Sequence, residues 1–256
     1  MRTLTLFLLL SACSKPAPCP EPLFGRPAAK TGLSAEQCQP SCGSCSTPIL
    51  PTEWTPERLA ALKEWTQETP FSELTADPYS ADAGTPSDGV CAVVPTGAKR
   101  YRVETFADEA AAKTAGAFLT HHGACGVCST LADLHLYASN PDLGAPVKQC
   151  GVDTFGMGFD ANVRCLEGLG FTRPCAQIWA YNTANTRRAC LDPCVRFGGD
   201  PYHLADAGLN ACLACDEEKS GPVFKAVAGR TRRNTGIPSA ICRPCSEAQP
   251  VAHDYP

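Results

Sequence analysis

The 256-residue sequence lacks the short motifs of the common enzyme classes. It contains no Gly-x-Ser-x-Gly, no His-Glu-x-x-His, no phosphate-binding glycine loop and no EF-hand loop. These absences argue against the usual hydrolases, zinc proteases and nucleotide-binding enzymes. The chain also has no basic surplus, since 22 Lys and Arg face 26 Asp and Glu for a formal net charge of −4. We therefore expect no nucleic-acid partner, because nucleic-acid-binding proteins carry large basic surfaces.

The first residues have the pattern of an export signal. A positive start, Met1-Arg2-Thr3, is followed by a short apolar run over residues 4–10 and then by small residues. The apolar run is too short to span a bilayer as a helix. We predict a signal peptide over residues 1–12; an ordinary secretory signal followed by an incidental cysteine is the alternative.

The segment Leu10-Ser11-Ala12-Cys13 resembles the lipobox of bacterial lipoproteins, in which small residues precede a cysteine. The resemblance covers residues 1–13 only. It implies that Cys13 is lipidated, for example by palmitate, and becomes the mature N-terminus, so that the membrane is a partner. Several acyl chains anchor a protein far more firmly than one. Ser14 resembles the outer-membrane sorting pattern, which implies that location if the source is Gram-negative.

Cysteine is abundant, with 17 in the chain. Without Cys13, an even number remains, and a dense, even set behind an export signal indicates disulfide bonds. The spacing leaves the connectivity open. The predicted disulfide cysteines are Cys19, Cys38, Cys42, Cys45, Cys91, Cys125, Cys128, Cys150, Cys165, Cys175, Cys190, Cys194, Cys212, Cys215, Cys242 and Cys245.

The remaining pattern predicts a tether and one domain. Residues 13–52 are rich in proline and cysteine, which is typical of a semi-rigid tether. Residues 53–256 predict a disulfide-rich single domain that is mainly α with a minor β hairpin. The hairpin is expected over residues 90–94 and 99–106, where apolar residues alternate around a Pro-Thr-Gly turn. The helices are expected over residues 55–67, 108–121, 129–139, 159–169, 174–191, 209–218 and 220–233.

The most chemically suggestive stretch runs from residue 121 to residue 137. It places His121 and His122 before a glycine, a Cys-x-x-Cys formed by Cys125 and Cys128, and a helix. Three interpretations stay open. The cysteines could staple different elements, form a redox pair with a thiol activated at a helix N-terminus, or join other pairs in a zinc site. Because a predicted helix precedes the motif, the resemblance to thioredoxin-type motifs is limited to four residues.

Histidines and arginines supply further candidate sites. His121, His122 and His135 could bind zinc or copper, although histidines at a helix end also complement the dipole. The cations Arg230, Arg232 and Arg233, with Arg188 from another helix, could grip an anion. Dipole complementarity at the end of a helix over residues 220–233 explains the same cations without a ligand. A polar band over residues 181–188 could line a pocket, face solvent or break a helix.

Together these patterns favour an exported, membrane-anchored, disulfide-stabilised lipoprotein of the cell envelope that binds an unknown protein or small molecule without a cofactor. The alternative is a thiol–disulfide oxidoreductase or a metal-dependent enzyme centred on residues 121–128.

Overall fold

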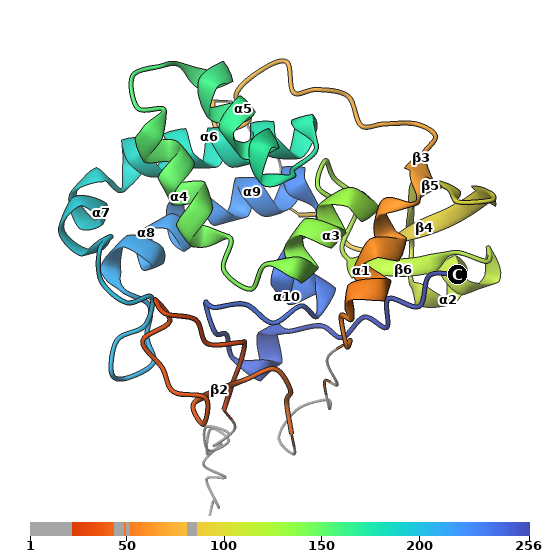
Figure 1. Ribbon diagram of the computed structural model, residues 1–256, viewed down its shortest axis with the longest axis horizontal. Helices are drawn as coiled ribbons and strands as arrows, with labels where there is room; N and C mark the ends of the chain where they lie inside the picture. Colours follow the sequence, from red (N-terminus) through yellow and green to blue (C-terminus); the bar gives the residue numbers. More distant parts are fainter. Residues whose placement is uncertain (1–21, 44–48, 50–51, 81–85) are drawn as a thin grey trace, which may run out of the picture.

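The computed structural model describes residues 22–43, 49, 52–80 and 86–256 of the chain (Figure 1). The predicted signal peptide, the lipidation site Cys13 and the cysteines Cys19 and Cys45 lie outside these residues. The described part forms a single domain that is 41% helical and 14% strand. It is therefore mixed α/β, and the predicted class, mainly α with one hairpin, is wrong in underestimating the strands.

The elements follow one another with these bounds. The N-terminal part contains β1 (Leu23–Phe24), β2 (Cys38–Gln39), α1 (Pro56–Lys63), β3 (Thr66–Gln67), β4 (Val90–Gly97), β5 (Arg100–Phe106), α2 (Glu109–Thr114) and β6 (Phe118–His122). The helical part contains α3 (Leu131–Ser139), α4 (Gly144–Asp153), α5 (Phe159–Leu169), α6 (Arg173–Ala189), α7 (Leu191–Phe197), α8 (Ala211–Lys219), α9 (Gly221–Ala228), α10 (Arg232–Thr235) and the 3-10 turn η1 (Cys245–Glu247).

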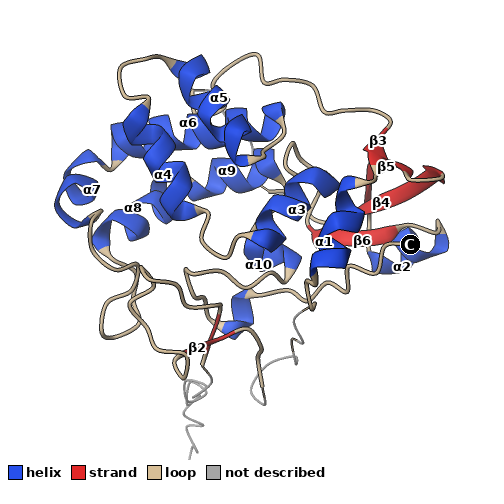
Figure 2. Cartoon of the chain, in the orientation of Figure 1, coloured by secondary structure: helices blue, strands red, loops and turns tan. Residues whose placement is uncertain are grey.

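A four-stranded sheet in the order β3-β5-β4-β6 lies at one side of the molecule, and most helices lie at the other (Figure 2). The predicted hairpin is confirmed as antiparallel β4 and β5. The predicted helix over residues 108–121 is wrong in its second half. Only the alanine-rich part forms α2; Gly116 then turns the chain at φ +68°, and β6 pairs antiparallel with β4. Pairing with the buried β4 outweighs local helix propensity here.

The main core lies between the sheet and the helices. Fully buried side chains from α3, α5 and α6 meet there, including Leu134, Leu166 and Ile178. Among the described helices none is both long and apolar enough to span a bilayer. The predicted helix over residues 220–233 is broken into α9 and α10, because Gly229 adopts φ +71°.

Seven disulfides tie the described cysteines together, so disulfide bonding is confirmed for them. The pairs are Cys38–Cys242, Cys42–Cys245, Cys91–Cys125, Cys128–Cys175, Cys150–Cys165, Cys190–Cys215 and Cys194–Cys212. The first two join residues about 200 positions apart and hold the N-terminal segment against the C-terminal tail. The predicted tether over residues 13–52 is therefore attached to the domain at least through Cys38 and Cys42.

Two glycines allow the loop before α3 to touch the end of α9. Val127 N donates to Val227 O at 3.0 Å and Cys128 N donates to Ala228 O at 2.9 Å. A Cβ on Gly126 would lie 2.5 Å from Gly229 N, and a Cβ on Gly229 would lie 2.9 Å from Ala124 O. Neither position has room for a side chain, so this contact requires both glycines.

We expect Gly229→Ala to destabilise the fold. A positive φ costs an L-residue about 1–2 kcal/mol, and forced overlap adds about 1–3 kcal/mol. The matched control is Gly116→Ala, which also has a positive φ but no atom within 4 Å of the added Cβ. Urea unfolding of the oxidised proteins should show a larger loss for Gly229→Ala; equal losses would contradict the proposed close contact.

Candidate functional site

The suggestive stretch over residues 121–137 is a strand end, a turn and a helix start. β6 ends at His122, and Gly123 turns the chain at φ +83°. The helix α3 begins after Thr130, whose hydroxyl caps it by accepting from Asp133 N at 3.0 Å. A strand therefore precedes the Cys-x-x-Cys, where a helix was predicted.

The two cysteines of that motif bond to different partners. Cys125 bonds to Cys91 on β4, and Cys128 bonds to Cys175 on α6. Cys128 and Cys175 are fully buried. The loop that carries the motif is thus bonded to the sheet and to a core helix. This agrees with the prediction that the two cysteines link different elements.

His121 lies in the interior rather than at a surface site. Its Nδ1 lies 2.9 Å from the carbonyl oxygen of His122, and its Nε2 lies 2.7 Å from Ser129 Oγ, which also accepts from Gly126 N at 2.9 Å. Burial, and then the nearby Arg230, hold the pKa of His121 well below its usual value. His121 is therefore neutral and serves as a hydrogen-bonding core residue.

The three candidate metal-binding histidines have different surroundings. Because strand side chains alternate, His121 points inward while His122 lines a pocket and contacts Pro250 O at 3.2 Å. His135 lies on α3, where burial and then Lys63 lower its pKa. Across the described ranges, no cluster of three or more His, Cys, Asp or Glu side chains could hold a metal ion.

The four candidate anion-binding arginines are also dispersed. Arg230 is fully buried and donates to Thr120 and to the carbonyls of Cys128 and Ser129. Arg232 donates to the carbonyls of residues 137, 140 and 238. Arg188 is exposed and donates to Asn185 Oδ1 at 2.7 Å. Of the four, Arg233 is the one that lines the cavity described below.

The polar band of α6 packs against the junction between α8 and α9. Asn185 Nδ2 donates to Ser220 Oγ at 3.0 Å, and Asn182 Nδ2 donates to Asp216 Oδ1 at 3.2 Å. Thr186 also bonds to Asp216. Burial raises the pKa of Asp216 against the opposing effect of these hydrogen bonds. The band is an interhelical polar contact, and it does not line the pocket described next.

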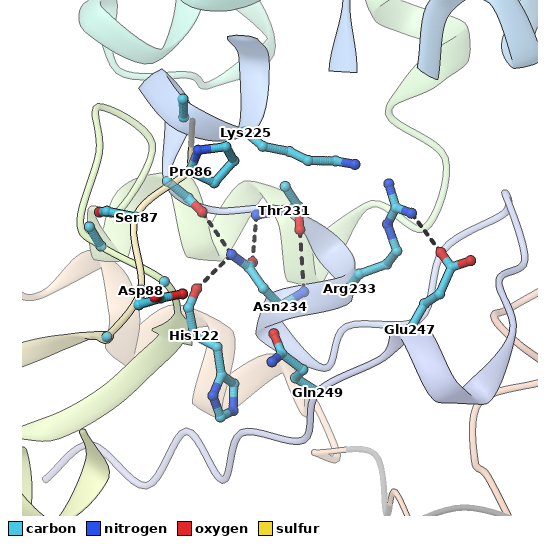
Figure 3. A pocket seen from close by; sticks show the side chains of 15 residues that line it. Pro86, Ser87, Asp88, His122, Lys225, Thr231, Arg233, Asn234, Glu247 and Gln249 are labelled. Atoms are coloured by element: carbon cyan, nitrogen blue, oxygen red, sulfur yellow. Dashed lines mark hydrogen bonds and ion pairs between the residues drawn. The ribbon is translucent and has the colours of Figure 1, made fainter. Parts of the chain in front are cut away.

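A polar cavity of about 610 Å³ lies beside the end of β6 (Figure 3). Four segments line it: the approach to β4, the end of β6 with the turn after it, the α9–α10 region, and the end of η1 with the segment after it. The lining residues are Pro86, Ser87, Asp88, Gly89, His122, Gly123, Ala124, Lys225, Ala226, Gly229, Thr231, Arg233, Asn234, Glu247 and Gln249.

Asn234 holds two of these walls together. Its Nδ2 donates to His122 O at 2.7 Å and to Gly229 O at 2.8 Å, while its Oδ1 accepts from Thr231 N at 2.7 Å. Its backbone N donates to Thr231 Oγ1 in a capping box at the start of α10 (Figure 3). The α9–α10 turn is thereby fixed against the strand end.

Charged side chains form a cluster at one wall, to which Lys225, Arg233 and Glu247 contribute directly. Glu217 accepts from Arg243 and, at 2.7 Å, from Arg233 Nη2, and its Oε2 lies 3.8 Å from Lys225 Nζ. Arg233 Nη1 also donates to Glu247 Oε2 at 2.6 Å. We refer to these five residues as the ionic cluster.

Charges within the ionic cluster shift the pKa values of Glu217 and Lys225. Burial alone would raise the pKa of Glu217, but Arg243, Arg233 and Lys225 together lower it below its usual value. Burial, and then repulsion by Arg233, lower the pKa of Lys225. The carboxylate thus stays ionised, while burial and the neighbouring Arg233 disfavour the ammonium form of Lys225.

The sequence prediction found Arg233 and the neighbourhood of His122, but it missed Lys225, Asn234 and Glu217. The run over residues 216–236 contained part of the signal, since its Glu217 pairs with its Lys225 and Arg233. Interpreting the cations as complements to the dipole of a helix over residues 220–233 concealed these contacts.

Comparison with known proteins gives one match. The model of a family of unknown function (DUF8771) matches residues 159–251. No curated protein and no solved structure matches the chain. The matched range begins at α5 and includes the whole ionic cluster and Asn234, whereas the walls contributed by residues 86–89 and 122–124 lie before it.

Proposed function

We propose that the protein is an exported, lipid-anchored binding protein of the cell envelope, and that a small polar ligand occupies the cavity beside β6. The cavity is within the usual size range for small-molecule sites, about 300–1,000 Å³. Nine of its fifteen lining residues are polar or charged, which suits a polar ligand.

The observation that carries this proposal is that the cavity walls are covalently fixed. The disulfide Cys91–Cys125 links the wall at residues 86–89 to the wall at residues 123–124. The disulfide Cys42–Cys245 holds η1, from which Glu247 projects. A preformed site loses little conformational entropy when a ligand binds, and this favours affinity.

The cysteines also favour binding over thiol chemistry. An enzyme built on Cys125 and Cys128 needs a free thiolate or a mutual disulfide, whereas both sulfurs are bonded elsewhere. The seven disulfides indicate an oxidising, exported environment.

The anchor has its own test, because it rests on the sequence resemblance at Cys13. Mass spectrometry of the N-terminal peptide from protein made in its native host should find acyl chains on Cys13. Cys13→Ser should release the protein from the membrane fraction. Retention of Cys13→Ser in that fraction would contradict the lipid anchor while leaving the cavity proposal intact.

The cavity is tested by filling it. Ala226 lines it from α9, so Ala226→Trp should block entry. We expect that, in a thermal-unfolding screen of small polar metabolites, the unblocked protein is stabilised by at least one compound that leaves Ala226→Trp unchanged. A ligand present at 100 times its Kd stabilises by about 2.7 kcal/mol.

The matched control is Ala110→Trp, at an exposed position of α2 outside the cavity. It should respond to the same compounds as the unsubstituted protein. Equal stabilisation of Ala226→Trp would mean that the ligand binds elsewhere, and the cavity proposal would then be wrong.

A further inference from the structure

The ionic cluster is unbalanced in charge. It contains three cations, Lys225, Arg233 and Arg243, and two carboxylates, Glu217 and Glu247. Among the described residues, Glu217 is ion-paired with all three cations, and Glu247 is ion-paired with Arg233. One positive charge therefore has no carboxylate of its own.

The geometry assigns that excess to Lys225. Its Nζ lies 3.8 Å from Glu217 Oε2, beyond hydrogen-bond distance, and that oxygen already accepts from Arg233 at 2.7 Å. Within the part of the chain that the structure describes, Lys225 Nζ has no hydrogen-bond acceptor. The side chain is 35% exposed and lies on the cavity wall, with its amine turned toward Arg233 (Figure 3).

We propose that the ligand of this cavity carries a carboxylate, which binds to Lys225 on the side of Arg233 that faces the cavity. This inference rests on the proposed function of the cavity. A carboxylate supplies the acceptor that the ammonium lacks and brings one negative charge to one excess positive charge. Charge-assisted hydrogen bonds of this kind are about twice as strong as neutral ones.

The same charges disfavour a phosphate monoester. A dianion at Lys225 would approach Glu217 and Glu247 at close range, and Asp88 is a second carboxylate in the lining beside Glu247. Repulsion between like charges is strong where water is partly excluded. The cluster is thus suited to a monoanion, and the rest of the cavity leaves room for a polar body larger than the carboxylate.

The experiment uses NMR of the full oxidised chain, labelled with 15N so that the lysine Nζ and the backbone amide resonances are observed. The probes are sodium acetate, its neutral isostere acetamide, inorganic phosphate and sodium chloride, all at matched ionic strength. Acetate should shift the Lys225 Nζ resonance and the amides of Gly123 and Thr231 saturably. Acetamide and chloride should not do so, and phosphate should bind more weakly than acetate.

Substitutions test whether acetate binding depends on Lys225. Lys225→Met should weaken acetate binding at least tenfold, and Lys225→Arg should retain it. The matched control Lys113→Met, on exposed α2, should bind as the unsubstituted protein does. The inference is overturned if acetate gives no saturable shift, if acetamide, chloride or phosphate matches it, or if Lys225→Met binds equally well.

The two proposals fail in different ways. If acetamide or another neutral probe shifts the amides of Gly123 and Thr231 and acetate does not, the carboxylate inference is wrong and the cavity remains a binding site. If the metabolites of the thermal screen also stabilise Ala226→Trp, the binding function of the cavity itself is wrong.

Discussion

Replacing Arg230 with methionine should lower the free energy of unfolding by about 3–5 kcal/mol, the range expected when one member of a buried charged network is removed. The Arg230 guanidinium is completely buried and donates four hydrogen bonds, at 2.7–3.2 Å, to Thr120, Cys128 and Ser129. Two acceptors lie on the outer edge of the sheet, at Thr120 O and Oγ1. The others are carbonyls of the loop that leads to α3.

Methionine would fill most of the space but would donate nothing. Each buried acceptor left without a partner costs about 1–3 kcal/mol. The buried carboxylate of Asp133 would also lose a nearby cation that lowers its pKa against the larger effect of burial. Arg230→Lys should recover part of the loss, since it retains the charge but not the planar set of donors.

Urea unfolding of exported, oxidised protein measures this effect. The matched control is Arg196→Met, whose side chain is 67% exposed and ion-paired to exposed Asp192, so its loss should be about 0–1 kcal/mol. A loss for Arg230→Met no larger than that of the control would show that the sheet edge does not depend on the guanidinium.

The different positions of Arg230 and Arg233 could not be predicted from the local sequence. Both belong to one basic run, and a continuous helix would place them three residues apart on one face. Gly229 breaks that helix, so Arg230 enters the core and Arg233 reaches the ionic cluster. The break depends on the close approach of Gly126, which is about a hundred residues away and invisible to any local pattern.

The elements with strong local signals were predicted well. Thr55 caps α1 as expected from its position before a proline, and α5 has the predicted bounds over residues 159–169. The helix α4 was missed, because Gly144, Pro146 and Gly151 give its ten residues little helix propensity. Packing against α5 and the disulfide Cys150–Cys165 hold it instead.

The cavity illustrates the same division between local and non-local information. The pattern around residues 121–128 directed attention to the correct region, since His122, Gly123 and Ala124 line the cavity. The chemistry there comes from Lys225 and the ionic cluster. The cysteines that made the region conspicuous supply rigidity through Cys91–Cys125. Disulfide partners follow from tertiary structure, so spacing alone could not separate a reactive pair from two structural bonds.

Acidification should destabilise the protein well before its carboxylates titrate, because the buried His121 and His253 must remain neutral in the fold. Burial lowers the pKa of His253 to about 3, and it holds that of His121 well below the usual value. In the unfolded chain both titrate near pH 6.5. Below that pH each of the two histidines is protonated in the unfolded state but not in the folded state. The free energy of unfolding therefore falls by up to about 1.4 kcal/mol per pH unit for each histidine.

The two histidines together should therefore cost about 4 kcal/mol between pH 7.5 and pH 5. Asp133 and Asp216 act in the opposite direction at lower pH, because burial raises their pKa in the fold. Comparing the protein with a His253 variant cancels that contribution. In the fold His253 contacts Thr235 O at 2.8 Å and Tyr255 Oη at 3.0 Å, and a glutamine amide can supply the same donor and acceptor.

The free energy of unfolding in urea should be measured for His253→Gln and for the unsubstituted protein from pH 7.5 to pH 5. Over this range it should fall by about 2 kcal/mol less for His253→Gln. The difference corresponds to one proton fewer taken up on unfolding. Lys113→Gln, which changes an exposed side chain that does not titrate in this range, should fall in parallel with the unsubstituted protein. If His253→Gln also follows that parallel course, the folded state accepts a proton at His253, and the loss of stability in acid must arise elsewhere.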